Sequence, residues 1–176
     1  MLTLYFKLEF YTPKQADFSL LYKIMAKINT GDIFEIDTNK GKAYFQCVKI
    51  DKLKCDTIKV FNQLYDERPS SIENIANVND NYFIVFPLSV ALHRKLVSKV
   101  GYIPLAPDFE LPKYTRDKHV IRRQFLGWHI VDNTTLKRQF VEKLSAEQKL
   151  LSPSGIWNDT LLKEQLEAGW NLENWN

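Results

Sequence analysis

The chain opens with a strict alternation of apolar and polar residues. Positions 2, 4, 6, 8 and 10 are all leucine or phenylalanine, whereas positions 3, 5, 7 and 9 carry polar groups, which is the pattern of a half-buried strand. The Thr-Pro-Lys-Gln sequence at 12–15 is a helix-capping pattern, and apolar residues follow at 18, 21, 25 and 28. We predict that residues 1–28 form a strand–helix extension packed on the main sheet.

The next block, residues 31–61, has the pattern of three strands joined by short loops. Residues 31–36 predict a strand, 37–42 a hairpin loop, and 43–50 a returning strand that is apolar on both faces, as an interior strand is. After a short turn, residues 55–61 predict a third strand. Sequential strands with short connections form an antiparallel meander, which curls with the usual twist.

The remaining residues mix strand and helix signals without a regular βαβ order, and residues 89–99 fit neither period. The other expected elements are a short helix capped at 70–73, strands at 82–86, 100–105 and 120–131, a loop over 106–118, a short helix capped by Ser145 and a last helix capped by Asn158 or Asp159. The pattern therefore predicts one α+β domain, residues 1–176, built on a curled, small-barrel-like antiparallel sheet with short flanking helices.

The 176 residues contain no recognisable catalytic pattern. The six glycines are isolated and no Gly-x-Ser-x-Gly sequence occurs, so neither a phosphate-binding loop nor a nucleophile elbow is predicted. The histidines (93, 119, 129) and the cysteines (47, 55) lack metal-ligand spacing. We expect a protein that is not an enzyme and that uses no metal or cofactor. Without a long apolar run or a secretory leader, the expected location is the cytoplasm.

The net charge of +3 is unevenly distributed along the chain. Residues 113–141 carry 7 basic and 2 acidic side chains, whereas residues 142–176 carry 3 basic and 6 acidic ones. The basic stretch mixes cations with aromatic rings, as nucleic-acid surfaces do; its cations are Lys113, Arg116, Lys118, Arg122 and Arg123. The acidic tail holds three of the four tryptophans, a residue type favoured at interface hot spots; its candidate contact residues are Glu164, Glu167, Trp170, Glu173 and Trp175.

Three short motifs carry a resemblance to a known family. Gly-Asp-Ile-Phe-Glu-Ile at 31–36, Gly-Lys-Ala-Tyr-Phe at 41–45 and Val-Gly-Tyr-Ile-Pro-Leu at 100–105 resemble the immunity protein 26 family, whose members accompany bacterial polymorphic toxins. The resemblance covers roughly residues 29–110. It implies an α+β fold, no catalysis, and tight binding to a cognate protein toxin in the producing cell. It supplies no catalytic residue.

Two functions follow from these patterns. The first is a non-enzymatic immunity protein that neutralises a cognate toxin, with the acidic tail as its contact surface and the basic stretch as the alternative. Trp175 itself is expected to dock on the protein's own sheet, leaving the tail glutamates outside to steer a basic partner. The second function is a small β-barrel that binds nucleic acid. An enzyme without a recognisable motif ranks last, no membrane partner is expected, and the oligomeric state is left open.

Overall fold

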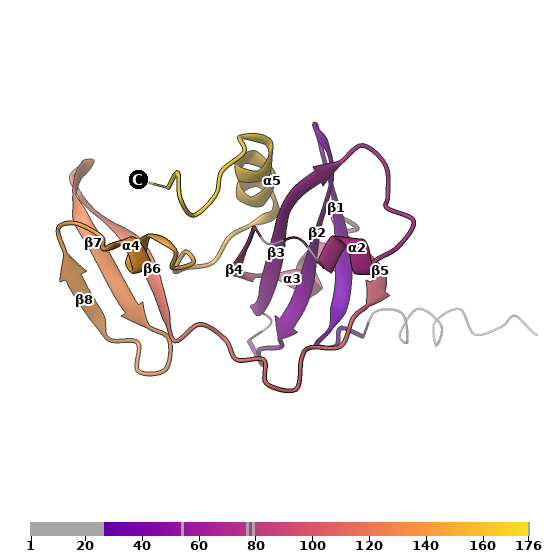
Figure 1. The fold of residues 1–176 in the computed structure, drawn as a ribbon, viewed down its shortest axis with the longest axis horizontal. Helices are drawn as coiled ribbons and strands as arrows, with labels where there is room; N and C mark the ends of the chain where they lie inside the picture. The colour runs from indigo at the N-terminus through magenta and orange to yellow at the C-terminus, as the bar shows by residue number, and fades with distance from the viewer. Residues whose placement is uncertain (1–26, 54, 77, 79, 176) are drawn as a thin grey trace, which may run out of the picture.

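A computed structural model describes residues 27–175, apart from 54, 77 and 79. The strand–helix extension expected over residues 1–28 lies outside the described residues, except for its last two positions. The described chain is α+β, with antiparallel strands in two separate sheets and a few short helices (Figure 1). The α+β class is therefore confirmed. The strands form two open sheets rather than one, and neither is closed into a barrel.

The first sheet contains the predicted meander and has the strand order β4-β3-β2-β1-β5. Its strands are β1 (Asp32–Thr38), β2 (Gly41–Lys49), β3 (Asp56–Tyr65), β4 (Asn81–Phe86) and β5 (Ser98–Tyr102). The strand that is apolar on both faces, β2, lies in the middle of the sheet, as its pattern predicts. The hairpin between β1 and β2 turns at residues 39 and 40, which is tighter than the predicted loop.

Both faces of the first sheet are covered. One face packs under α3 (Leu88–His93) and α5 (Asp159–Glu167), and there the ring of Phe34 stacks on that of Phe45 at 5.7 Å. The other face packs against α2 (Glu73–Ala76), which buries Ile75. The ambiguous residues 89–99 contain most of α3 and the start of β5, two elements too short to establish a period.

The second sheet consists of β6 (Tyr114–Ile121), β7 (Gln124–Asp132) and β8 (Arg138–Val141), in that order. The predicted loop is correct over 106–113 but wrong over 114–118, which belong to β6, and the single strand predicted over 120–131 is interrupted by a turn, so this region is a hairpin. Its turn consists of Arg122 and Arg123, both in the left-handed region with φ of 49° and 66°. Positive φ at both central residues is the geometry of a tight hairpin turn, but no glycine or asparagine marks it in the sequence.

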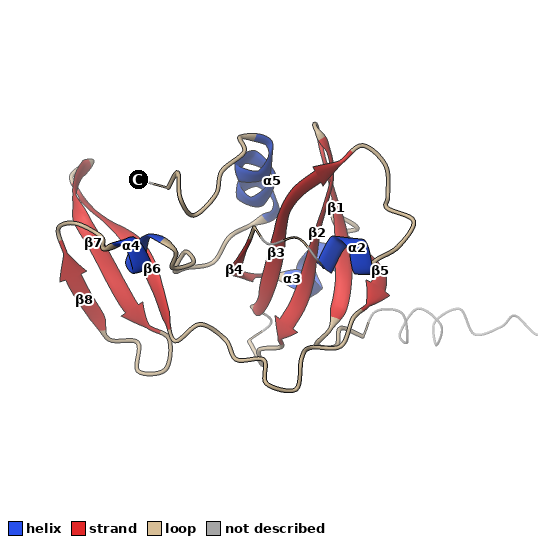
Figure 2. Cartoon of the chain, in the orientation of Figure 1, coloured by secondary structure: helices blue, strands red, loops and turns tan. Residues whose placement is uncertain are grey.

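The segment 152–157 joins the two sheets. On one side it bonds to β6, where the Arg116 amide donates to the Ser152 carbonyl at 2.9 Å and the Ser154 amide donates to the Arg116 carbonyl at 2.7 Å. On the other side the Trp157 amide donates to the carbonyl of Val85 in β4 at 2.9 Å. Figure 2 shows this loop, drawn in tan, passing between the red strands of the two sheets.

The two C-terminal helices begin where the sequence predicts. Ser145 forms a capping box with Gln148 at the start of α4 (Ala146–Lys149). The Asn158 side chain accepts a hydrogen bond from the Leu161 amide at 2.8 Å at the start of α5. Leu162 and Leu166 of α5 are buried against the first sheet, so this helix is held by its apolar face.

Candidate interaction surfaces

The tail tryptophans pack against the protein's own aromatic rings, with Trp157 buried and Trp170 and Trp175 half-buried. Trp170 contacts Tyr82 of β4 with ring centroids 4.9 Å apart and Trp157 at 5.4 Å. Trp175 contacts Trp170 at 5.6 Å and Trp128 of the second sheet at 5.2 Å. The tail therefore docks on the protein's own sheets. Trp170 and Trp175 are two of the tail residues expected to contact a partner. Their rings instead contact other aromatic rings of this protein.

Arg116, one of the five cations of the basic stretch, is buried. Its guanidinium lies 4.8 Å from the ring centroid of Trp128 and 4.5 Å from that of Trp175, and its relative exposure is 0%. Its Nε donates to the Leu151 carbonyl at 3.2 Å and its Nη2 to the Leu172 carbonyl at 2.6 Å. Burial lowers the pKa of Arg116 to about 10. Arg116 therefore pins the tail to β6 and contributes nothing to an exposed basic surface.

The three tail glutamates are not equivalent. Glu164 and Glu173 are exposed, whereas Glu167 accepts hydrogen bonds from the backbone amide of Asn39 at 2.8 Å and from its side chain at 3.2 Å. Lys40 Nζ donates to the Glu167 carbonyl at 2.6 Å. The bond from the Asn39 amide holds the pKa of Glu167 below its usual value. Glu167 thus fastens α5 to the β1–β2 turn.

Replacing Glu167 by alanine is expected to lower the free energy of unfolding, because it removes both hydrogen bonds from Asn39. The matched change Glu164→Ala, on the same helix, is expected to change it by less than about 0.5 kcal/mol. Urea unfolding followed by tryptophan fluorescence measures both. Equal effects of the two changes would show that the contact with the β1–β2 turn does not stabilise the fold.

The tip of the β6–β7 hairpin exposes a group of large apolar side chains. We call residues 120–126 the hairpin tip; its apolar members are Val120, Ile121, Phe125 and Leu126, which are 40–51% exposed. Arg122 and Arg123 form the turn between them and are exposed. The sequence did not reveal this surface, because residues 120–131 have the pattern of one continuous strand.

Two further cations of the basic stretch lie against aromatic rings of the second sheet. Lys118 Nζ is 6.0 Å from the ring centroid of Phe125 and 5.6 Å from that of Trp128. Lys113 Nζ is 5.2 Å from the ring of Tyr114. With Arg122 and Arg123 at the turn, four of the five predicted cations therefore lie outside the core of the second sheet.

Two histidines that are separate in the sequence meet on the second sheet. The ring centroids of His119 and His129 are 4.4 Å apart, and Phe140 lies beside both rings. Burial, and then the charges of His119 and Arg138, lower the pKa of His129. The pair holds two imidazoles close together. In the described part of the chain, no group of three or more His, Cys, Asp or Glu side chains is arranged to hold a metal ion.

The first sheet contains a buried carboxylate whose partners come from two segments, β2 and the loop after β3. Glu35 of β1 accepts hydrogen bonds from Arg68 Nε at 2.8 Å and Nη2 at 3.0 Å, from Tyr44 Oη at 2.8 Å and from Lys42 Nζ at 3.1 Å. The bonds from Arg68 above all lower the pKa of Glu35 to about 2. A carboxylate satisfied this fully holds structure together and offers no free oxygen for proton transfer.

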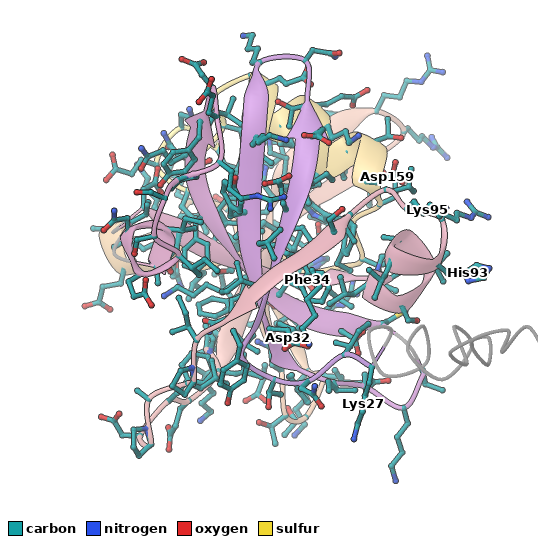
Figure 3. The ribbon with its side chains drawn as sticks, turned by 90° about the vertical axis from the view of Figure 1, so that its right-hand side faces the viewer. Lys27, Asp32, Phe34, His93, Lys95 and Asp159 are labelled. Atoms are coloured by element: carbon teal, nitrogen blue, oxygen red, sulfur yellow. The ribbon has the colours of Figure 1, made fainter. Side chains whose placement is uncertain are left out.

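The other polar groups near the first sheet have local roles. Asp32, at the start of β1 in Figure 3, accepts from the Asn29 amide and pairs with Lys99 Nζ at 2.7 Å. Cys47 is buried and its thiol pKa is raised to about 12, so it is a poor nucleophile. His93 and Lys95 lie at the outer end of α3 and point away from the sheet (Figure 3).

The described residues include no helix that is both long and apolar enough to span a membrane. Two exposed surfaces remain as candidate functional features. One is the hairpin tip, and the other is the part of the tail that bears the exposed Glu164 and Glu173. Comparison of the chain with known proteins finds no matching family model, no matching curated protein and no matching solved structure.

Proposed function

We propose that this protein is a non-enzymatic immunity protein that binds and neutralises a cognate protein toxin, and that the hairpin tip makes the central contact. The observation that carries this proposal is the exposure of four large apolar side chains around two arginines. Val120 and Phe125 are cross-strand partners and share one face of the hairpin, and exposed large apolar side chains gathered at one tip are typical of a protein-binding surface. The sequence resemblance to an immunity family supports the same class.

The form of the hairpin tip favours a protein partner. The tip lies at the end of the second sheet that is opposite to the segment 103–113, which connects β5 to β6. It points away from the first sheet (Figure 1). Phe125 packs edge-on against Trp128 at 5.5 Å, so one anchor is held in place before a partner arrives. Preordered side chains lose less conformational entropy on binding. Arg122 and Arg123 complement a partner surface that bears carboxylates.

The double change Phe125→Asp/Leu126→Asp tests the hairpin tip. Removal of two apolar anchors is expected to weaken the complex at least about 100-fold, since a single hot-spot side chain contributes about 2 kcal/mol or more. The partner to be used is a candidate toxin identified from the neighbouring reading frames, and the measurements are calorimetric affinity and rescue of growth on co-expression. Leu150→Asp, which changes an exposed leucine elsewhere, is the control and is expected to leave both unchanged. Unaltered affinity of the double variant would refute this surface.

Charge reversal distinguishes the hairpin tip from the acidic tail. Arg122→Glu/Arg123→Glu is expected to slow association several-fold at low salt, because exposed charges steer encounter. Glu164→Lys/Glu173→Lys is expected to leave the association rate unchanged. The opposite result, measured by stopped-flow fluorescence, would place the toxin on the acidic tail.

Nucleic-acid binding is the second candidate, and the pairing of Lys113 with Tyr114 and of Lys118 with Phe125 favours it. Binding of single-stranded oligonucleotides would fall steeply with salt, since each neutralised phosphate releases counterions. A toxin complex with an apolar centre would lose mainly association rate. Titration of a labelled oligonucleotide at several salt concentrations separates the two functions.

A further inference from the structure

The two sheets enclose a cleft of about 380 Å³. Side chains from β2, β3 and β4 line one wall, and side chains from β6, β7 and β8 line the other. The segment that joins the sheets closes one end with Pro153, Ser154 and Gly155, and the linker before β6 contributes Leu111 and Pro112. Ligand sites form preferentially at such junctions, and this volume lies within the range of small-molecule pockets.

Each wall of the cleft is one row of cross-strand partners. On the first sheet, Lys49 of β2 is paired with Thr57 of β3, and Thr57 with Val85 of β4. On the second sheet, Thr115 of β6 is paired with Val131 of β7, and Val131 with Arg138 of β8. All six residues line the cleft. Each wall thus presents a valine, a threonine and, at one end, a cation.

The charge of the lining has one sign. Lys49 and Arg138 are exposed and line the cleft, and no aspartate or glutamate is among its lining residues. Within the part of the chain that the structure describes, neither cation forms an ion pair. The rest of the lining is mainly apolar and includes Phe83, Val85 and Leu136. Such a lining suits a ligand with one negative charge and an apolar body.

We propose that this cleft binds a small apolar carboxylate, with the carboxylate held by Lys49 or Arg138 and the hydrocarbon body against Phe83, Val85 and Val131. Thr57 supplies a hydroxyl group that donates a hydrogen bond to a carboxylate oxygen, whereas the Thr115 hydroxyl donates to Asn133 Oδ1 at 2.9 Å. A bare cation beside an apolar wall attracts an anion more strongly than the same cation in open water, because the wall lowers the local dielectric. This site is separate from the hairpin tip and does not depend on the toxin.

The test uses octanoate and its uncharged analogue octanol as probes, with isothermal titration calorimetry on the full chain. Octanoate is expected to bind at least about tenfold more tightly than octanol. The double change Lys49→Gln/Arg138→Gln is expected to weaken octanoate binding about tenfold or more while leaving octanol binding unchanged. The control is Arg94→Gln/Lys143→Gln, which removes two exposed cations that do not line the cleft, and its octanoate affinity is expected to match that of the wild type.

A second variant tests the location of the site. Thr57→Phe places a large ring in the cleft at a strand position that tolerates aromatic residues, and it is expected to abolish binding of both probes while the circular dichroism spectrum stays native. Equal affinity for octanoate and octanol, octanoate binding that survives either cleft variant, or no octanoate binding by the wild-type protein would each overturn the proposal.

Discussion

Replacing Arg116 by alanine is expected to lower the free energy of unfolding by about 3 kcal/mol, within the range for truncating a large buried side chain. The change removes a guanidinium that lies between two tryptophan rings and leaves the carbonyls of Leu151 and Leu172 without their donor. The loss of the tail contact is expected to appear in tryptophan fluorescence. Urea unfolding gives the free energy.

Arg116→Met separates packing from charge. Methionine refills much of the volume, and it removes the cost of burying a cation that has no carboxylate partner among the described residues. We therefore expect a loss of only about 1 kcal/mol, from the two unpaired carbonyls. Arg94→Ala, at an exposed arginine, is the control and is expected to lose less than about 0.5 kcal/mol. If Arg116→Ala behaved like Arg94→Ala, the guanidinium would not hold the tail.

Glu35→Gln is expected to lower the free energy of unfolding at pH 7 by about 2–3 kcal/mol. Hydrogen bonds from Arg68, then from Tyr44 and Lys42, lower the pKa of Glu35 from 4.5 to about 2. Each pKa unit corresponds to about 1.4 kcal/mol, so the lowered pKa corresponds to about 3.5 kcal/mol before screening by water. The Arg68 side chain is 54% exposed, so water screens its pairing and favours the lower end of the range.

The same change is expected to alter the response to acid. Because the pKa of Glu35 is lower in the folded than in the unfolded protein, the stabilisation that Glu35 contributes is fully present above pH 4.5 and is lost as the pH falls toward 2. The free energy of unfolding, measured between pH 7 and pH 2, should therefore fall less steeply with pH in Glu35→Gln than in the wild type. Glu142→Gln, at an exposed site, should keep the wild-type slope. Parallel slopes for Glu35→Gln and wild type would refute this account.

The sequence predicts those helices and strands that are determined by residues close together in the chain. The interior strand β2 follows from its own apolar pattern, and the starts of α4 and α5 follow from the capping side chains of Ser145 and Asn158. The β6–β7 hairpin could not be found this way. Its turn residues, Arg122 and Arg123, have no intrinsic preference for positive φ, so the pairing of the two strands imposes that conformation.

The candidate surfaces were harder to predict than the fold, because burial depends on distant residues. Arg116 belongs to the same basic stretch as the exposed Arg122 and Arg123, but its Nη2 donates to the carbonyl of Leu172, 56 residues away. The contact between His119 and His129 likewise depends on the hairpin register, which a bulge after His119 shifts by one residue. Neither the burial of Arg116 nor the contact between the two histidines can be inferred from the pattern of residues along the chain. The exposed apolar side chains at 120–126 are recognisable only once the turn is known.

The segment 152–157 also bears on how the protein avoids aggregation. An uncovered edge strand offers amides and carbonyls to other chains and is a route to aggregation and domain swapping. This segment occupies parts of two such edges at once, on β4 and on β6. Pro153 has no amide hydrogen to donate, so the segment makes a poor template for a further strand. Detachment of the tail would therefore expose the unpaired edges of β4 and β6 together. Variants that weaken the attachment of the tail should aggregate before they unfold completely.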